Sequence, residues 1–358
     1  MLKIEHLEYN EDVYDITVEK NENFYANGIL VHNCEITLPT KPLKDINDEE
    51  GEISLCTLSA INWGKIRDPA DFERPCTLAV RALDELLDYQ DYPVAAARNS
   101  TMARRPLGVG IINLAYWLAR NDLSYQHIDH DGLNRLHGYT EGWSYYLIKA
   151  SIELAKEKGA CPKSNETKYG QGIFPIDTYK KEVDELASPV YRFDWDGLRR
   201  DAQTYGIRNS TLMALMPSET SAQISNATNG IEPPRSLVSV KQSKDGVLKQ
   251  VVPEVRKFKN KYDLLWDQKS PEGYIKIVSV LQKFIDQGIS VNTSYNPKFY
   301  EEEKIPMSEM IGHLLMFYKY GGKQLYYFNT NDGAGEYEDV PLAASEAVDD
   351  EDCSSCKI

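Results

Sequence analysis

The residues from Val31 to Cys34 combine three side chains that can cleave a peptide bond. The side-chain amide of Asn33 can attack its own backbone carbonyl and form a succinimide, which breaks the bond to Cys34. His32 can polarise that carbonyl or protonate the leaving amine. The thiol of Cys34 can first take up an acyl group as a thioester. This order predicts self-processing, and the alternative is a plain turn beside a buried cysteine.

Six cysteines in a chain of 358 residues do not indicate a secreted disulfide scaffold. Cys353 and Cys356 form a CxxC pair near the end of an acidic segment. Such a pair can exchange with another disulfide and then meet a thioredoxin-like protein. Zinc binding is the alternative, although no second ligand pair lies nearby, so we predict no metal site. We expect Cys76 and Cys161 to fill the core. Cys56 lies in an apolar strand-like run, and taken alone it would also be expected to fill the core.

Residues 217–221 (PSETS) follow an apolar run at 210–216 and precede a short helical pattern. Unpaired N–H groups and the positive end of the helix dipole could bind a diphosphate there. A plain capping box, in which the Ser and Thr only cap the helix, is the alternative. The candidate phosphate-binding residues are Pro217, Ser218, Glu219, Thr220 and Ser221.

Tyr326 and Tyr327 are adjacent in the strand-like run QLYYFNT. Strand alternation predicts one ring on each face of a sheet, as ordinary packing residues. Adjacent phenols could also serve as stepping points for coupled proton and electron transfer.

Several elements must position these residues. Short alternating segments with an Asn27-Gly28 turn predict β-hairpins within residues 1–33. Apolar periodicity predicts helices around 78–87, 143–154, 277–287 and 310–320. The runs 210–216, 289–295 and 324–330 are strand-like. The alternation of helix and strand predicts an α/β fold, and we expect the residues after 331 to be unstructured.

The composition narrows the function. Hydrophobic residues make up 42% and charged residues 27%, which is typical of a globular protein with two or three domains. The formal charge of −15 argues against a nucleic-acid partner. The longest apolar stretch, 107–119, is interrupted by Asn113 and is too short to span a membrane. The first ten residues lack a secretory signal pattern, so we expect a cytoplasmic protein.

Residues 13–34 (VYDITVEKNENFYANGILVHNC) resemble the last two sequence blocks of inteins. The resemblance places His32, Asn33 and Cys34 at the splicing positions and makes Asp15 a candidate for assisting the branched intermediate. Glu22 stands where many inteins carry a His. Because the chain opens with Met1, it resembles the C-terminal half of a split intein.

Residues 35–358 resemble the C-terminal part of the catalytic subunit of class I ribonucleoside-diphosphate reductase, of bacterial or phage type. Five motifs occur in the family's order: EITLPTKPLKDINDEEGEISLCTLSAINWG, RRPLGVGIINLAYWLA, LMPSETSAQISNATNGIEPPR, QLYYFNT and CSSCKI. The resemblance implies that residues 217–221 bind substrate phosphates. It also implies that Glu35 acts as the base and that Cys56 is one member of the active-site redox pair. Tyr326 and Tyr327 would form a radical path, and Cys353 and Cys356 a tail dithiol.

The two resemblances imply three domains: an all-β intein half over 1–33, the second half of a ten-stranded α/β barrel over 34–330, and a flexible acidic redox tail over 331–358. The thiyl cysteine, the other redox cysteine and the regulatory nucleotide domain would lie on an N-terminal reductase fragment that carries the intein N-half. The isolated chain would then be inactive until trans-splicing. An inactive remnant, or a self-processing fragment without reductase activity, is the alternative.

The implied partners are that fragment, a small metal-containing subunit that supplies the radical, thioredoxin or glutaredoxin as reductant, and ribonucleoside diphosphates. The ligated subunit would form a homodimer, and this chain itself would bind no cofactor. The family motif is Asn-x-Cys-x-Glu, whereas Cys34 directly precedes Glu35. Cys34 is therefore expected to occupy the spacer position, with the thiyl cysteine as the last partner residue before the intein. The alternative is that Cys34 itself is the thiyl residue.

Overall fold

The computed structural model describes residues 23–26, 29–32, 41, 43–45, 48–188, 190–243 and 246–331. The chain divides into two compact units, Met1–Cys34 and Glu35–Ile358, and this boundary lies one residue after the expected end of the intein half. Several predicted residues lie outside the described part of the chain, namely Asp15, Asn33, Cys34, Glu35, Cys353 and Cys356.

In the first unit the chain forms a β-hairpin. Strand β1 (Asn23–Ala26) pairs antiparallel with β2 (Ile29–His32), and the register joins Asn23 to His32 and Ala26 to Ile29. The two residues between the strands are Asn-Gly, which favours the tight turn of a two-residue hairpin. The hairpin predicted at this place is confirmed, and it ends at the histidine expected to act in splicing.

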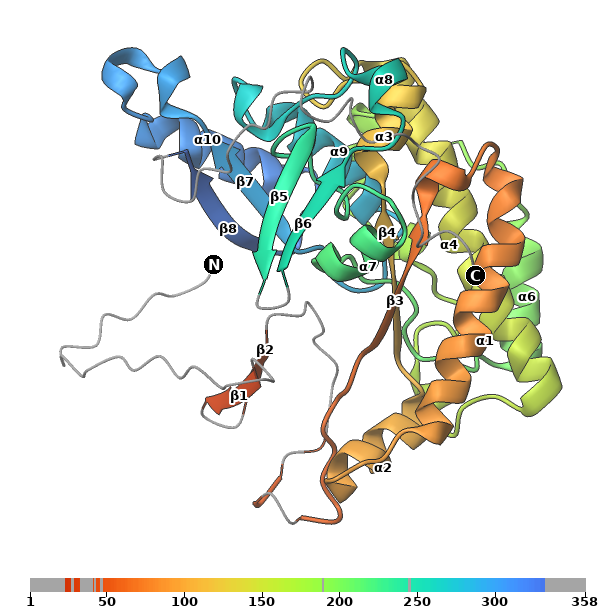
Figure 1. Cartoon of the computed structure of the whole chain (residues 1–358). Helices are drawn as coiled ribbons and strands as arrows, with labels where there is room; N and C mark the ends of the chain where they lie inside the picture. Colours follow the sequence, from red (N-terminus) through yellow and green to blue (C-terminus); the bar gives the residue numbers. More distant parts are fainter. Residues whose placement is uncertain are drawn as a thin grey trace. The chain divides into compact units, whose positions relative to one another are not determined.

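Among its described residues, the second unit contains five neighbouring parallel segments (Figure 1). Strand β3 (Thr57–Asn62) pairs with β4 (Leu107–Ile112), and β7 (Val291–Tyr295) pairs with β8 (Leu325–Thr330). The predicted strand at 210–216 forms only single bridges, from Met213 to Val109 and from Leu215 to Ile289. These bridges nevertheless place residues 210–216 between the two pairs, as the third parallel segment in chain order. Strands β5 (Val238–Ser243) and β6 (Gly246–Val251) form a separate antiparallel pair.

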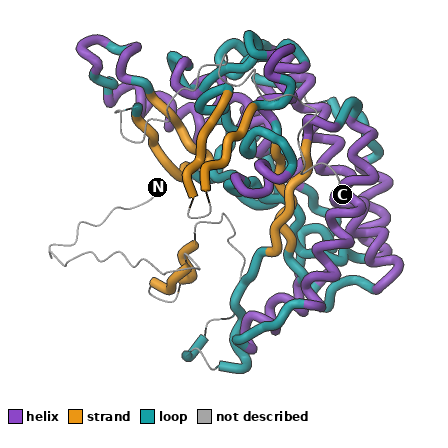
Figure 2. Tube along the Cα trace, in the orientation of Figure 1, coloured by secondary structure: helices purple, strands orange, loops and turns teal. Residues whose placement is uncertain are grey.

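Helices occupy the connections between the parallel segments, because a parallel crossover needs a long return path. In Figure 2 the long helices form a layer beside the strands of this unit. The helices are α1 (Glu73–Tyr89), α2 (Ala95–Arg104), α3 (Leu114–Arg120), α4 (His130–Lys158), α5 (Pro175–Thr178), α6 (Trp195–Tyr205), α7 (Glu219–Ile224), α8 (Val255–Phe258), α9 (Glu272–Gln282) and α10 (Met307–Lys319).

The predicted boundaries of α9 were wrong. The helix begins directly after Pro271 and ends at Gln282, five residues before the predicted end. The side-chain amide of Gln282 donates to the carbonyls of Ile285 (3.4 Å) and Gln287 (3.0 Å). These bonds hold the chain in a turn, so the apolar residues that continue the pattern are buried without being helical.

The core lies where α1 packs against β3 and β4 on one side and against α4 on the other. Trp63, Trp117 and Trp143 are fully buried there, and the ring centroids of Trp63 and Trp117 lie 6.0 Å apart. Cys76 of α1 is fully buried and Cys161 nearly so, and burial raises the pKa of both thiols. The prediction that these two cysteines fill the core is confirmed.

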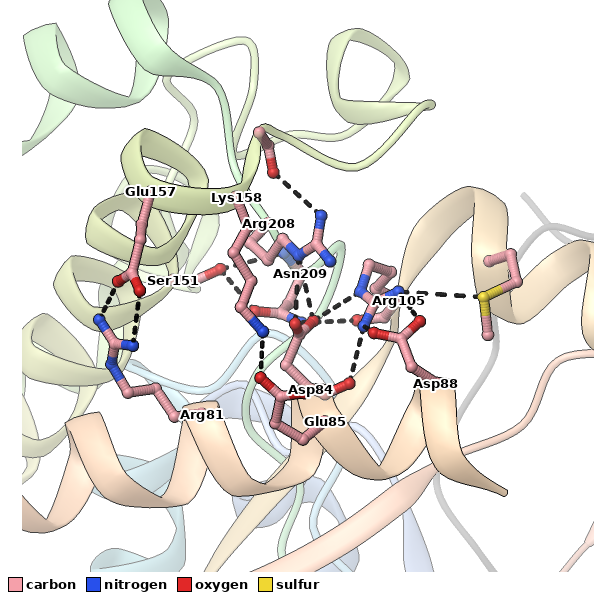
Figure 3. A network of polar contacts seen from close by, with 12 residues as sticks. Arg81, Asp84, Glu85, Asp88, Arg105, Ser151, Glu157, Lys158, Arg208 and Asn209 are labelled. Atoms are coloured by element: carbon pink, nitrogen blue, oxygen red, sulfur yellow. Dashed lines mark hydrogen bonds and ion pairs between the residues drawn. The ribbon is translucent and has the colours of Figure 1, made fainter. Parts of the chain in front are cut away.

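A buried ionic network ties α1 to Arg208 and Asn209, which directly precede the third parallel segment (Figure 3). Asp84 of α1 is fully buried, and its carboxylate lies 2.5 Å from Arg105 Nε and 3.2 Å from Arg208 Nε. The side-chain amide of Asn209 donates to the same carboxylate at 3.2 Å. Arg105 follows α2 with a φ of 49°, a left-handed conformation that this network must hold.

We expect Asp84→Asn to destabilise the second unit by about 3–5 kcal/mol, because it leaves two poorly solvated guanidinium groups without their shared carboxylate. All five tryptophans lie in this unit, so their fluorescence during urea denaturation reports its stability. Asp201→Asn is the matched control, because Asp201 pairs with Lys156 on the surface and should cost under about 1 kcal/mol. Equal losses in both variants would contradict the structural role of the network.

Candidate active site

A cavity of about 420 Å³ lies against the parallel segments. We call it the tyrosine cavity. Its wall includes Pro217 from the end of the third segment, Asn292 from β7, and Tyr326 and Tyr327 from β8. A volume of this order suits a small-molecule ligand. The structure thus brings part of the predicted phosphate motif and both predicted radical-path tyrosines to one cavity.

The phosphate motif begins where the third parallel segment ends. Ser218 is buried at the N-cap position of α7, but its hydroxyl donates to the carbonyl of Met216 (3.0 Å) and does not cap the helix. Its backbone N–H donates to Asn229 Oδ1 at 3.2 Å. The predicted side-chain cap by Ser218 is therefore wrong, because the hydroxyl turns back to a carbonyl at the segment end. Helix α7 has six residues, and the backbone of Glu219, Thr220 and Ser221 forms its first turn.

Cys56 lies just before β3 and not inside a strand as predicted. The register joins Leu58 to Gly108, which places the half-buried Cys56 over β4. A Cβ atom on Gly108 would lie 2.7 Å from Cys56 Sγ, so only glycine leaves room for this thiol. A Cβ atom on Gly110 would likewise meet Met216 Sδ at 2.7 Å. Met216 lines the tyrosine cavity, whereas Cys56 does not.

A β-bulge brings Tyr326 and Tyr327 together. The register between β7 and β8 joins Val291 to Leu325 and then Asn292 to Tyr327, so Tyr326 is the extra residue. The Tyr327 N–H donates to Asn292 Oδ1 at 3.2 Å. The two rings have centroids 4.1 Å apart, and the Tyr327 hydroxyl lies 3.4 Å from the Tyr326 hydroxyl. The expectation of one ring on each face is wrong, because a bulge interrupts strict alternation.

The 3.4 Å contact between the two hydroxyls is the geometry that the predicted transfer of a proton and an electron between the phenols would need. Tyr327 is 52% exposed, and Tyr326 is half-buried. The pair therefore links the outer surface of β8 to the wall of the cavity.

The family model of the ribonucleotide reductase barrel domain matches residues 17–328. The chain belongs to this family. It is 57% identical over 305 residues to the ribonucleoside-diphosphate reductase subunit alpha of Haemophilus influenzae, covering 85% of this chain and 40% of that protein.

Two further relatives are alpha subunits of the same kind of reductase. The alpha subunit of ribonucleoside-diphosphate reductase 1 of Escherichia coli is 54% identical over 328 residues, covering 90% of this chain and 42% of that protein. The corresponding subunit of Enterobacteria phage T4 is 44% identical over 332 residues, covering 91% and 42%. The chain thus spans about two fifths of the length of these relatives.

One wall of the tyrosine cavity was not predicted from the sequence. The loop after α7 contributes Asn229, Glu232 and Arg235 to the lining. The side-chain amide of Asn292 donates to Glu232 Oε1 at 2.5 Å, which joins the loop to β7. The backbone N–H of Thr228 donates to Asn113 Oδ1 at 3.0 Å. The segment NATNGIEPPR carries turn residues, which signal a loop but not the wall that it meets.

Of the predicted splicing, base and tail residues, the structure describes only His32. His32 ends β2, and the splicing, base and tail residues named above lie outside the described ranges. In the part of the chain that is described, no group of three or more His, Cys, Asp or Glu residues could hold a metal ion. Among the same residues, no helix combines the length and the apolar character that crossing a bilayer requires.

Proposed function

We propose that this chain, once joined to an N-terminal fragment, forms the C-terminal part of the catalytic subunit of class I ribonucleoside-diphosphate reductase. The observation that carries the proposal is the tyrosine cavity, where the start of the phosphate motif and the bulged tyrosine pair meet. The ligated enzyme would reduce ribonucleoside diphosphates to deoxyribonucleoside diphosphates by thiyl-radical chemistry.

Each residue has a defined step in this scheme. The first turn of α7 holds the substrate diphosphate through its backbone N–H groups. The thiyl radical of the partner fragment takes the ribose 3′-hydrogen, and Glu35 takes the proton of the 3′-hydroxyl. The 2′-hydroxyl then takes a proton from a thiol of the redox pair and leaves as water. Cys56 and a second cysteine on the partner fragment supply two electrons and become a disulfide. Cys353 and Cys356 then reduce this disulfide by thiol exchange, and thioredoxin or glutaredoxin reduces the tail pair.

The parallel segments support the need for a partner fragment. Within the described residues, β3 pairs only with β4, and β8 pairs only with β7. Both outer strands thus present unpaired backbone groups, which native proteins cover or pair. Five further strands from the N-terminal fragment would complete the proposed ten-stranded barrel.

Helix α10 offers a surface for the small radical-supplying subunit. Its exposed apolar residues recur at helical spacing and form one stripe, made of Met307, Ile311, Leu314, Leu315 and Tyr318. An exposed apolar stripe of this kind is typical of a protein contact. The chain passes from α10 directly to β8, so a subunit docked on the stripe would lie near the tyrosine pair.

We also propose that residues 1–33 act as the C-terminal half of a split intein. The sequence His-Asn-Cys and the hairpin that ends at His32 support this assignment. The reductase family match begins at residue 17, inside the same segment. The alternative is that residues 1–33 belong to the reductase and stay in the enzyme. Trans-splicing distinguishes the two, because it would remove these residues.

The shuttle role of the tail tests the reductase proposal. In ligated enzyme, we expect Cys353→Ser with Cys356→Ser to remove turnover with thioredoxin but to spare turnover with dithiothreitol, because only the exchange route is lost. Cys56→Ser should stop multiple turnover with either reductant. Cys161→Ser changes a buried packing cysteine and is the control, with activity retained. Full thioredoxin-dependent turnover in the tail variant would contradict the proposed shuttle.

A further inference from the structure

A second cavity, of about 760 Å³, lies at the amino ends of four parallel segments. Its wall includes Arg104 before β4, Thr211 before the Met213 bridge, Asp286 before Ile289, and Lys323 before β8. We call it the lysine cavity. It shares no lining residue with the tyrosine cavity. Ligands of open α/β sheets usually bind at the carboxyl ends of strands, so the reductase scheme does not account for this cavity.

The lining of the lysine cavity is strongly basic in a chain whose formal charge is −15. Its two acidic residues are Glu166 and Asp286. The Asp286 carboxylate is already committed, because it accepts the Tyr169 hydroxyl and two backbone N–H groups. Burial also raises the pKa of this carboxyl. The basic lining residues are Arg104, Lys163, Lys168, Lys180, Lys283 and Lys323.

Three of these cations have carboxylate partners. Arg104 and Lys163 share the carboxylate of Glu52, at 2.7 Å and 3.0 Å. Lys283 is almost fully buried and lies 2.8 Å from Asp184. These three charges are therefore balanced within the protein.

The other three, Lys168, Lys180 and Lys323, have no carboxylate within 4 Å among the residues that the structure describes. Lys323 Nζ donates to the carbonyls of residues 285, 286 and 287, which uses all three of its protons. Lys180 Nζ donates one bond, to the Tyr318 carbonyl at 2.9 Å. Lys168 is exposed at the cavity wall. Lys168 and Lys180 thus keep ammonium protons for a ligand, and Lys323 adds a fixed positive charge.

Ammonium groups lie over two of the tyrosine rings that line the lysine cavity. Lys181 Nζ and Lys283 Nζ lie 3.7 Å and 4.5 Å from the ring centre of Tyr179, and Lys180 Nζ lies 3.7 Å from that of Tyr318. The ammonium groups over these two rings favour recognition of a ligand by its charge.

We propose that the lysine cavity binds a small phosphorylated molecule, whose phosphate groups are held by Lys168 and Lys180. Ammonium groups are common phosphate ligands, and charge-assisted hydrogen bonds to phosphate are about twice as strong as neutral ones. This site goes beyond the proposed reductase function and does not depend on it, because the reductase scheme places substrate phosphates at the tyrosine cavity.

The test is calorimetric titration of the complete 358-residue chain with inorganic triphosphate, ATP and adenosine. We expect triphosphate and ATP to bind with similar affinity and adenosine not to bind. Lys168→Glu with Lys180→Glu should weaken triphosphate binding at least about tenfold. The neutral pair Lys168→Gln with Lys180→Gln should weaken it in the same direction, and circular dichroism checks folding. Binding should also fall as salt is raised.

Two controls make the result specific. Lys65→Glu with Lys259→Glu makes the same change in net charge at two exposed lysines outside the cavity and should leave binding intact. Lys65→Gln with Lys259→Gln matches the neutral pair in the same way and should also leave binding intact. Absence of triphosphate binding, or an equal loss in either Lys65 and Lys259 pair, would overturn the assignment.

Discussion

Replacement of Tyr326 or Tyr327 by phenylalanine is expected to lower turnover of the ligated enzyme at least about a thousandfold, equal to about 4 kcal/mol in activation free energy. Phenylalanine has no hydroxyl, so it cannot exchange a proton and an electron with its neighbour across the 3.4 Å contact. The measurement is reduction of a ribonucleoside diphosphate by ligated enzyme mixed with the small subunit. Substrate binding and subunit binding should be unchanged in both variants.

Tyr205→Phe is the matched control for this experiment. Tyr205 ends α6, is 48% exposed, and lies outside the lining of the tyrosine cavity. It should keep full turnover. If either tyrosine variant at the bulge keeps turnover close to that of the unaltered enzyme, the pair does not carry the radical.

The second large effect concerns splicing. We expect the chain, mixed with a fragment that carries the intein N-half, to lose residues 1–33 and to gain the partner's reductase segment through a peptide bond. Asn33→Ala should block release of the C-terminal intein half completely, because alanine has no side-chain amide to form the succinimide. Intact mass spectrometry of the mixture separates the ligated product from unprocessed chains.

Asn21→Ala is the control, because it removes the same amide outside the His-Asn-Cys sequence. It should leave the ligated product unchanged. A ligated product of normal mass and yield from the Asn33 variant would contradict the mechanism. Retention of residues 1–33 in an active reductase would instead favour a segment that belongs to the enzyme.

Features that depend on residues close together in the chain could be predicted from the amino-acid sequence. The Asn-Gly pair predicted the turn between β1 and β2, because only a few residue types favour that backbone. Apolar periodicity located α1, α4 and α10, because one face of each must meet a neighbour. Alternation of these helices with strand-like runs indicated the α/β class. The ordered motifs pointed to the reductase family, to which the chain belongs.

Features that depend on residues far apart in the chain could be seen only in the folded structure. Tyr326 and Tyr327 lie together because the pairing with β7 forces a bulge, which the local pattern of β8 does not encode. The Cys56 thiol has its place because Gly108 on the neighbouring strand leaves room for it.

Which charged side chains form ion pairs also depends on residues far apart in the chain. The sequence shows forty Lys and Arg residues but not which of them are neutralised. Glu52 and Asp184 balance some cations of the lysine cavity and leave Lys168 and Lys180 without a described carboxylate partner. Ion pairing acts through space over a few ångströms, so it depends on the packing of segments that the chain order keeps far apart.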